Sequence, residues 1–179
     1  MNKIVSELDK LHLNYIRENV TNFIKDCAKK FDNSKCLVLD IAPQDHNGAI
    51  EFFKTSEVRT LDIDKDSKAN YIADLCQNNA SIIPDELFDI IICTEVLEHT
   101  LNPFDAVKEI YRILKPGGHV CVSVPFNFRI HGPLPDCWRF TEHGLRALFS
   151  SFNICELNTL ETNERDLMPI HYTLIAKKD

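Results

Sequence analysis

The chain has 179 residues, 44% of them hydrophobic and 26% charged, which is ordinary for one soluble globular domain with a single core. A formal net charge of −7 argues against a nucleic-acid partner, because such a partner favours a basic surface. No apolar run approaches the about 20 residues of a membrane span, and the first residues hold no signal-peptide core, so we expect a cytoplasmic protein.

The N-terminal segment is predicted to be helical. Apolar residues recur at helical spacing over residues 4–31, and the first stripe includes Leu8, Leu11 and Tyr15. Such a helix either packs across a sheet or forms a lid over a ligand, and the pattern leaves both alternatives open.

Three strands are predicted in the first half of the core. Residues 65–70 are too few for a crossover helix, so the second and third strands are joined by a loop or a single turn. Residues 75–87 also read as a loop. Each strand carries an aspartate near its carboxyl end: 36–41 with Asp40, 58–64 with Asp62, and 71–75 with Asp74.

A strand–helix–strand unit follows. Residues 88–92 are apolar and β-branched, as in a strand that is buried on both faces. Asn102 and Pro103 are typical of a helix start, and residues 115–118 (Lys-Pro-Gly-Gly) end that helix. Alternating valines at 120–124 form the next strand, which predicts a right-handed crossover and a parallel pair.

The long segment 125–141 comes after this strand, where loops are usually functional. His131 or Asp136 could take a proton from a hydroxyl, and Arg139 could bind a phosphate or carboxylate, with Trp138 beside it on the acceptor side. Alternatively, Asp136 and Arg139 pair with each other and only shape the loop.

The end of the chain is predicted to be a helix at 141–151 and an antiparallel pair of strands at 152–160 and 168–176, followed by a solvated tail at 177–179. The seven cysteines form no CxxC pair and read as small buried hydrophobes in a reducing compartment. No metal cluster stands out, so we expect no metal site.

FDIIICTEVLEH at 88–99, followed by NPFDAVKEIYRILKPGGHVCVSVPF at 102–126, resembles the second half of a class I S-adenosylmethionine-dependent methyltransferase domain. The resemblance extends over about residues 35–177. It implies an α/β fold: a Rossmann-like, seven-stranded, mostly parallel sheet in the order 3-2-1-4-5-7-6, with the last strand antiparallel and helices on both faces. We expect a single domain over 1–179, with a helical segment at 1–33 before the core.

The resemblance also implies a function: methyl transfer from the cofactor S-adenosyl-L-methionine to an oxygen or nitrogen of a small acceptor. The pattern HGPLPDCWRFT at 131–141 is similar to the acceptor loop of bacterial enzymes that serve polysaccharide and cell-surface sugar pathways. The partner is then a small molecule, and the oligomeric state stays open, a dimer being possible.

Cofactor contacts are implied at the ends of the first four strands. Asp62 would bind the ribose hydroxyls, with Asp64 as the runner-up, and Asp74 would accept from the adenine amino group. Asp40 would face the ammonium of the methionine moiety, and the Leu75 amide would donate to the adenine ring. The remaining cofactor residues that the resemblance implies are Ile41, Ala42, Gly48, Ile63, Thr94 and Glu95.

Two points stay open in this assignment. The family's glycine-rich turn is reduced to Gly48 in residues 42–48, so a non-catalytic binding module with a degenerate cofactor turn is the alternative function. Histidine has an ordinary pKa near neutrality, so His99 could act as a general base. The EVLEH pattern also occurs in methyltransferases that act on unlike acceptors, so His99 could instead order its loop.

Overall fold

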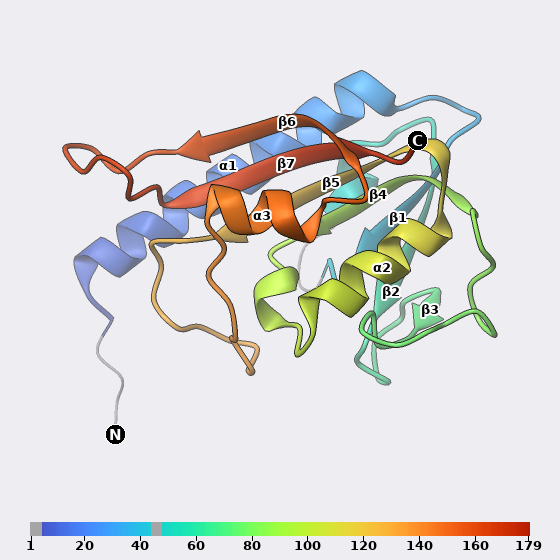
Figure 1. The fold of residues 1–179 in the computed structure, drawn as a ribbon, viewed down its shortest axis with the longest axis horizontal. Helices are drawn as coiled ribbons and strands as arrows, with labels where there is room; N and C mark the ends of the chain where they lie inside the picture. Colours follow the sequence, from blue (N-terminus) through green and yellow to red (C-terminus); the bar gives the residue numbers. More distant parts are fainter. Residues whose placement is uncertain (1–4, 44–47) are drawn as a thin grey trace.

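The structure is a computed structural model that describes residues 5–43 and 48–179. In these residues a seven-stranded sheet has the order β3-β2-β1-β4-β5-β7-β6, and β7 runs antiparallel to both neighbours (Figure 1). This confirms the predicted order and the reversed last strand. The strands are β1 (Leu37–Ile41), β2 (Glu57–Asp62), β3 (Tyr71–Ile72), β4 (Phe88–Thr94), β5 (Leu114–Pro125), β6 (Asn153–Leu160) and β7 (His171–Lys177).

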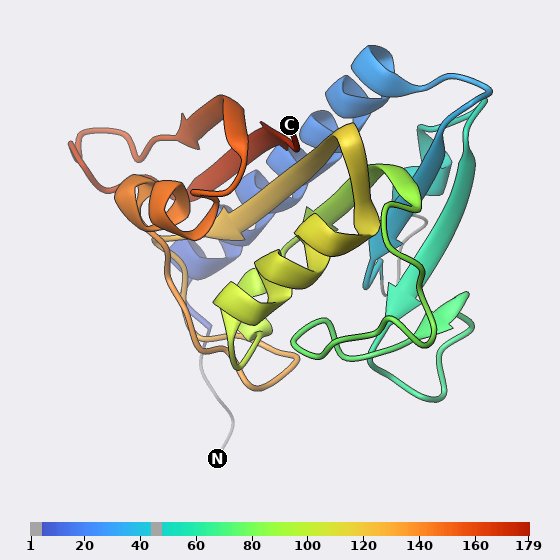
Figure 2. The ribbon, with the colours of Figure 1, turned by 45° about the vertical axis from the view of Figure 1, so that its right-hand side comes forward.

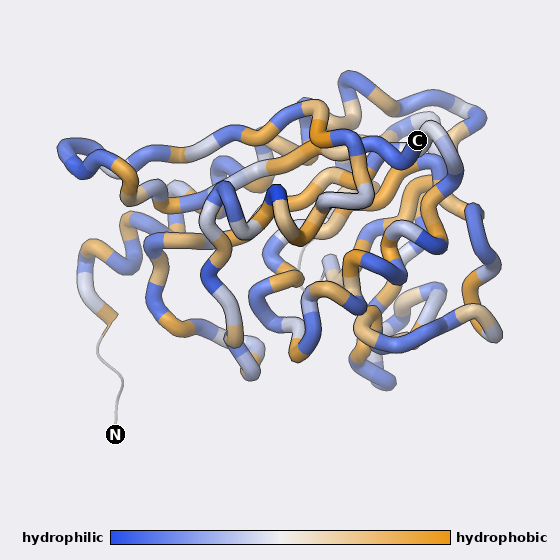
Figure 3. The backbone as a smooth tube through the Cα atoms, viewed as in Figure 1, coloured by the Kyte–Doolittle hydropathy of each residue, from blue (hydrophilic) through white to orange (hydrophobic). Residues whose placement is uncertain are grey.

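Helices cover both faces of the sheet, α1 on one face and α2 and α3 on the other (Figures 1 and 2). Alternate residues of β4 explain this arrangement, since Ile91 packs in the cluster with α2 and α3 while Ile90 and Ile92 pack in the cluster with α1. The apolar colouring runs along these central strands in Figure 3. The helical elements are α1 (Glu7–Phe31), α2 (Pro103–Ile113), α3 (Glu142–Leu148) and the short 3₁₀ turns η1 (Gly48–Glu51) and η2 (Leu97–His99).

Helix α1 is one unbroken helix of 25 residues, and Ser6 caps its start through a reciprocal capping box with Asp9. Its second half buries Ile16, Val20, Ile24, Cys27 and Ala28 against the sheet, which favours the packing alternative there. The first predicted stripe lies on this helix but is not packed against the sheet, since Leu8, Leu11 and Tyr15 are 56%, 44% and 42% exposed. His12 is buried instead, and its Nδ1 lies 2.9 Å from the carbonyl oxygen of Asn127.

The connections of the first half contain less helix than a doubly wound fold usually has. The chain between β1 and β2 forms only the turn η1 in its described part, where parallel strands are usually joined by a helix. The third strand ends at Ile72, shorter than predicted, and residues 75–87 form a loop as predicted. The carboxyl ends of β1, β2 and β4 therefore open onto loops.

Lys178 corrects the prediction of a solvated tail. Its side chain is 7% exposed, and its Nζ donates to the carbonyl oxygens of Tyr111 at 2.9 Å and Leu114 at 2.8 Å. The ammonium therefore caps the last carbonyls of α2, where the helix dipole favours a positive charge.

Strand β6 forms one edge of the sheet. Its pairing with β7 shifts register between Ile154 and Glu156, and the Glu156 carboxylate binds Lys30 of α1 at 2.6 Å. The other edge is the two-residue strand β3.

All seven cysteines are free. Cys27, Cys93 and Cys121 are buried as predicted, but Cys137 and Cys155 are exposed, so the interpretation as buried hydrophobes is wrong for these two. None of the described helices is long and apolar enough to cross a membrane.

Candidate active site

A cavity of about 730 Å³ lies at the carboxyl ends of β1, β2 and β4. This volume is within the range of small-molecule sites, and the position is where open α/β sheets bind ligands. Its lining includes the apolar residues Leu61, Ala73 and Leu75, and also Pro133 and Pro135 of the loop after β5. The predicted site residues on its lining are Ile41, Ala42, Asp62, Ile63, Asp74, Leu75, Glu95 and His99, together with the runner-up Asp64.

Asp62 and Asp74 are brought together on this lining. Asp62 ends β2, and its Oδ1 accepts from the Asp64 amide at 2.9 Å, so Oδ2 remains for a ligand. Asp74 holds the next loop in the same way, since its Oδ1 accepts from the Cys76 amide at 2.8 Å. Both carboxylates are therefore fixed by their own backbone before any ligand binds.

Asp40 is placed elsewhere. It is 2% exposed, does not line the cavity, and accepts from the Ala49 amide at 2.6 Å. Burial raises the pKa of this carboxyl to about 7, although the Ala49 bond opposes the shift. A Cβ atom at Gly48 would lie 2.2 Å from Asp40 Oδ2, so this glycine makes room for the carboxyl. Residues 44–47 of the predicted cofactor turn lie outside the described residues.

Ala42 has a backbone conformation that glycine usually adopts. Its φ is +50°, in the left-handed region, and it lines the cavity directly after β1. Glu95, directly after β4, also has a left-handed φ of +55°. Strained residues of this kind concentrate at ligand sites, so both strand ends carry the backbone signature of a binding site.

Glu95 belongs to a buried polar chain that sequence reasoning missed. Its Oε1 lies 2.6 Å from His171 Nε2 and accepts from the Ser123 hydroxyl at 2.7 Å, and Asn19 Nδ2 lies 2.8 Å from His171 Nδ1. Burial alone would raise the pKa of Glu95, but His171 and Ser123 together bring it below its ordinary value. Thr94, also predicted, lies in β4 opposite Ser123 and does not line the cavity.

The acceptor-loop residues form contacts within the chain. Asp136 Oδ2 accepts from Arg139 at 2.7 Å and from the His131 amide at 2.9 Å, and these bonds outweigh burial and lower the pKa of Asp136 to about 2. Arg139 also donates to the carbonyls of Phe128, Arg129 and Trp138. These contacts favour the loop-shaping alternative for Asp136 and Arg139.

The same loop is fastened to η2. The backbone amides of Cys137 and Trp138 donate to the Glu98 carbonyl, at 2.7 and 3.2 Å, and the Trp138 indole donates to the Thr100 carbonyl at 2.8 Å. Trp138, expected to contact the acceptor, is therefore an anchor of the loop and does not line the cavity.

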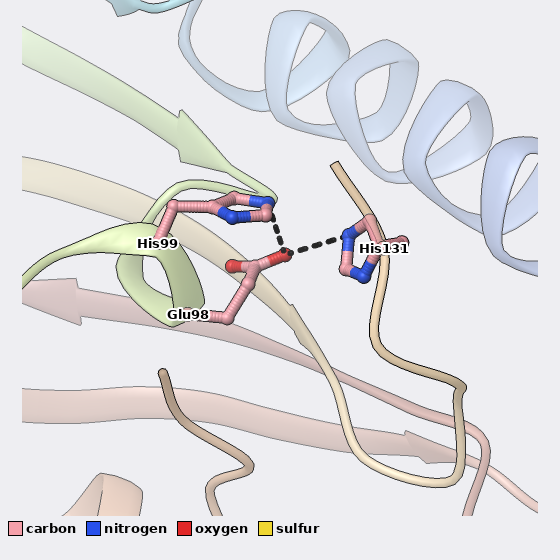
Figure 4. Close-up of side chains that lie close together, drawn as sticks. All are labelled: Glu98, His99 and His131. Carbon is pink, nitrogen blue, oxygen red and sulfur yellow. Dashed lines mark ion pairs between the residues drawn. The ribbon is translucent and has the colours of Figure 1, made fainter. Parts of the chain in front are cut away.

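Glu98, His99 and His131 converge in space although they are far apart in sequence (Figure 4). Glu98 Oε1 lies 3.8 Å from Nε2 of each histidine, and the Glu98 side chain is fully buried. Burial, and then the charge of Glu95, raise the pKa of Glu98 well above its ordinary value. Sequence reasoning noted the two histidines as candidate bases and missed Glu98, whose place in EVLEH was the available signal.

S-adenosylmethionine fits the chemistry of the cavity. Its lining carries four carboxylates, Asp62, Asp64, Asp74 and Glu95, against one lysine, Lys68. A sulfonium ligand with a net positive charge is favoured in such a field. The apolar wall suits an adenine ring, and carboxylates at the rim suit hydroxyl and amino donors.

The fold and the cavity define a Rossmann-like domain that binds its ligand at the carboxyl ends of its strands. A family model described as a methyltransferase domain matches residues 15–160. The chain belongs to this family of methyltransferase domains.

Comparisons with known proteins give one relative in sequence and two structures with a similar fold. The chain is 27% identical over 128 residues to a ubiquinone biosynthesis O-methyltransferase of Aliivibrio fischeri, covering 68% of this chain and 53% of the relative. A SAM-dependent methyltransferase from Methanosarcina mazei has a TM-score of 0.62 at 18% identity, covering 83% of this chain and 93% of that one. The PH0226 protein from Pyrococcus horikoshii has a TM-score of 0.66 at 17% identity, covering 91% of both chains.

The chain spans about half the length, or less, of the first curated relatives that it matches, with 21% of a Proteus mirabilis ubiquinone biosynthesis O-methyltransferase and 53% of the Aliivibrio protein. Neither of these relatives is named for a sugar or cell-surface pathway, so the predicted similarity to such enzymes is not supported.

Proposed function

We propose that this chain transfers a methyl group from S-adenosylmethionine to an oxygen of a small acceptor bound beside the loop after β5. The observation that carries the proposal is the cavity at the strand ends, with its apolar wall and its rim of carboxylates. When bound, the cofactor supplies an electrophilic methyl group on a sulfonium.

The proposed cofactor roles follow the lining of the cavity. Asp62 accepts from the ribose hydroxyls, Asp74 from the adenine amino group, and Ile63 and Leu75 contact the adenine faces. Ala42 presents backbone in a left-handed turn, where a close approach to the ligand is possible. Asp40, which accepts from the Ala49 amide, and Gly48, which leaves room for this carboxyl, then act as positioning residues.

Positioning and exclusion of water are the main demands of such an in-line displacement. Pro133 and Pro135 close the cavity on the acceptor side, and the bonds of this loop to the Glu98 carbonyl hold it there. Of the three predicted acid–base candidates, only His99 lines the cavity, which supports His99 as the candidate that touches an acceptor. Asp136 has a pKa of about 2 and is a poor base at neutral pH.

The acceptor is proposed from chemistry and from relatives together. The Aliivibrio and Proteus relatives are named O-methyltransferases of ubiquinone biosynthesis, which favours oxygen over nitrogen as the acceptor atom. The net charge of −7 favours a small molecule over a nucleic acid. A sugar acceptor is not proposed.

Calorimetry with S-adenosylhomocysteine tests the cofactor site. Loss of the Asp62 carboxylate in Asp62→Ala removes charge-assisted hydrogen bonds worth about 1.5–3 kcal/mol each, so affinity should fall about 10- to 100-fold. Asp66→Ala, an exposed aspartate outside the cavity, is the matched control and should bind normally. If Asp64→Ala loses affinity and Asp62→Ala does not, the ribose role belongs to Asp64.

The same measurement decides between the enzyme and the non-catalytic module. Binding of S-adenosylhomocysteine together with transfer of labelled methyl to phenolic or alcoholic acceptors supports the proposal. Absence of heat and of any thermal shift at millimolar ligand would favour the binding module.

A further inference from the structure

The Glu98 carboxylate is in an unusual position for a charged group. Its side chain is fully buried, and neither of its oxygens has a hydrogen-bond partner among the described residues. A buried carboxylate without a partner is strongly destabilising, so native proteins pair such groups or use them as metal ligands. The position calls for a cation or a proton between Glu98 and its neighbours.

His99 presents a lone pair to this carboxylate. Its Nδ1 lies 2.9 Å from the Pro135 carbonyl oxygen, and a carbonyl can only accept, so Nδ1 carries the hydrogen. In the neutral ring Nε2 is then an acceptor, 3.8 Å from Glu98 Oε1. A backbone carbonyl that fixes the tautomer of a histidine is the usual outer partner of a metal-binding imidazole.

His131 completes the cluster from the loop after β5. Its Nε2 lies 3.8 Å from Glu98 Oε1, and its Nδ1 lies 3.0 Å from Asp136 Oδ2, although not in line for a hydrogen bond. Asp136 is itself held by Arg139, so a carboxylate stands behind this imidazole as well.

We propose that Glu98, His99 and His131 form a binding site for one divalent transition-metal ion. One ligand atom from each residue lies within 4.8 Å of the other two, and the side chains converge on a common point (Figure 4). Neighbouring ligands of an ion with bonds of about 2.1 Å are about 3.4 Å apart in tetrahedral geometry, so the observed 3.8 Å requires a closure of a few tenths of an ångström.

The ligand types select the class of ion. Two imidazoles and one carboxylate suit manganese, iron, cobalt or zinc, whereas magnesium and calcium prefer oxygen ligands. The histidine side chains are 15% and 22% exposed, so an ion can reach the buried carboxylate between them.

The place of the site gives it a use. His99 belongs both to the cluster and to the cavity lining, which puts the ion at the wall nearest the proposed acceptor. Three protein ligands leave coordination positions for an acceptor oxygen, whose proton a bound cation makes easier to lose. This use rests on the proposed function, whereas the binding of the ion does not.

The test uses Mn²⁺ with chelator-treated protein and no cofactor, followed by calorimetry and electron paramagnetic resonance. One ion per chain is expected, with a loss of at least about 100-fold in affinity for Glu98→Gln and His131→Ala, since even outer partners of metal ligands are worth 10- to 100-fold. His143→Ala, an exposed histidine of α3, and Cys137→Ser, an exposed thiol near the site, are the matched controls and should bind normally.

A thermal shift separates lost binding from lost folding. Mn²⁺ should raise the unfolding midpoint of the parent chain and not that of Glu98→Gln, which keeps the shape of the side chain and should fold. No binding at millimolar Mn²⁺ or Co²⁺, or binding that is equal in all the variants, would overturn the site and identify Glu98 as a protonated buried acid. Because S-adenosylhomocysteine binding is measured separately, either proposal can fail while the other stands.

Discussion

Replacing Asp40 by asparagine should change how the stability of this protein depends on pH. The Asp40 carboxyl is 2% exposed, and burial raises its pKa to about 7, from an ordinary value of 3.8. The folded state therefore binds a proton more tightly than the unfolded state does. The stability that this proton provides is complete below pH 4 and is lost as the pH rises through 7.

The size of the effect follows from the shift. About three pKa units at about 1.4 kcal/mol each give an upper limit of about 4 kcal/mol between pH 4 and pH 8. Cys93, a titratable neighbour in β4, stays a neutral thiol over this range because burial raises its pKa far above it. Asp40→Asn keeps an oxygen for the Ala49 amide and has no charge to bury, so its gain in stability should grow from about 1.7 kcal/mol at pH 5 to about 4 kcal/mol at pH 8.

Urea unfolding at pH 5, 6, 7 and 8 measures this difference, and calorimetry with S-adenosylhomocysteine adds a second readout. Asp40 contacts the Ala49 amide and does not line the cavity, and asparagine keeps an oxygen for this contact. The variant should therefore bind the ligand with unchanged affinity. A variant that loses affinity, with a parallel pH dependence of stability in both proteins, would show that Asp40 faces the ligand ammonium and that the reasoning from burial is wrong.

Other substitutions test the backbone and the buried charges. Ala42→Gly should stabilise the fold by about 1 kcal/mol, because glycine adopts a left-handed φ without strain. Ala147→Gly in α3 should destabilise it by about 1 kcal/mol, and urea unfolding that changes stability in the same direction for both variants would contradict this reasoning. Lys178→Ala should destabilise by about 2 kcal/mol, since two carbonyls lose a buried donor, while Lys177→Ala should change stability little; equal effects would contradict the capping role. Asp32→Ala should lower the free energy of unfolding by about 2 kcal/mol, because the carboxylate accepts from three successive amides before β2, and an unchanged free energy of unfolding would count against these bonds.

The sheet could be predicted because its signals are local and agree with one another. The apolar run of β4, the Asn-Pro start of α2 and the alternating valines of β5 each specify one element, and their order specifies the crossover. The exposed first stripe of α1 could not be predicted, since helical periodicity identifies a face and says nothing about what covers it. The division of the chain into a helical segment and a core stays a prediction.

The site was predictable in part. Polar residues at strand ends share one edge of a parallel sheet, which is why Asp62, Asp74 and Glu95 reach the same cavity. Asp40 does not reach the cavity, because it lies within β1 and its carboxylate binds the Ala49 amide of η1. The pairing of Glu95 with His171, and of Glu98 with His131, depends on contacts between distant parts of the chain that no local pattern encodes.

The two margins of the sheet limit how copies of this chain can associate. Strand β6 is a poor template for pairing with a strand of another molecule, because it carries a register shift and its Glu156 binds Lys30 of α1. At the opposite edge, β3 has only two residues and therefore offers very few backbone groups for pairing. Continuous pairing across subunits is thus disfavoured on both sides. A dimer of this protein, if one forms, would be built from helices and loops.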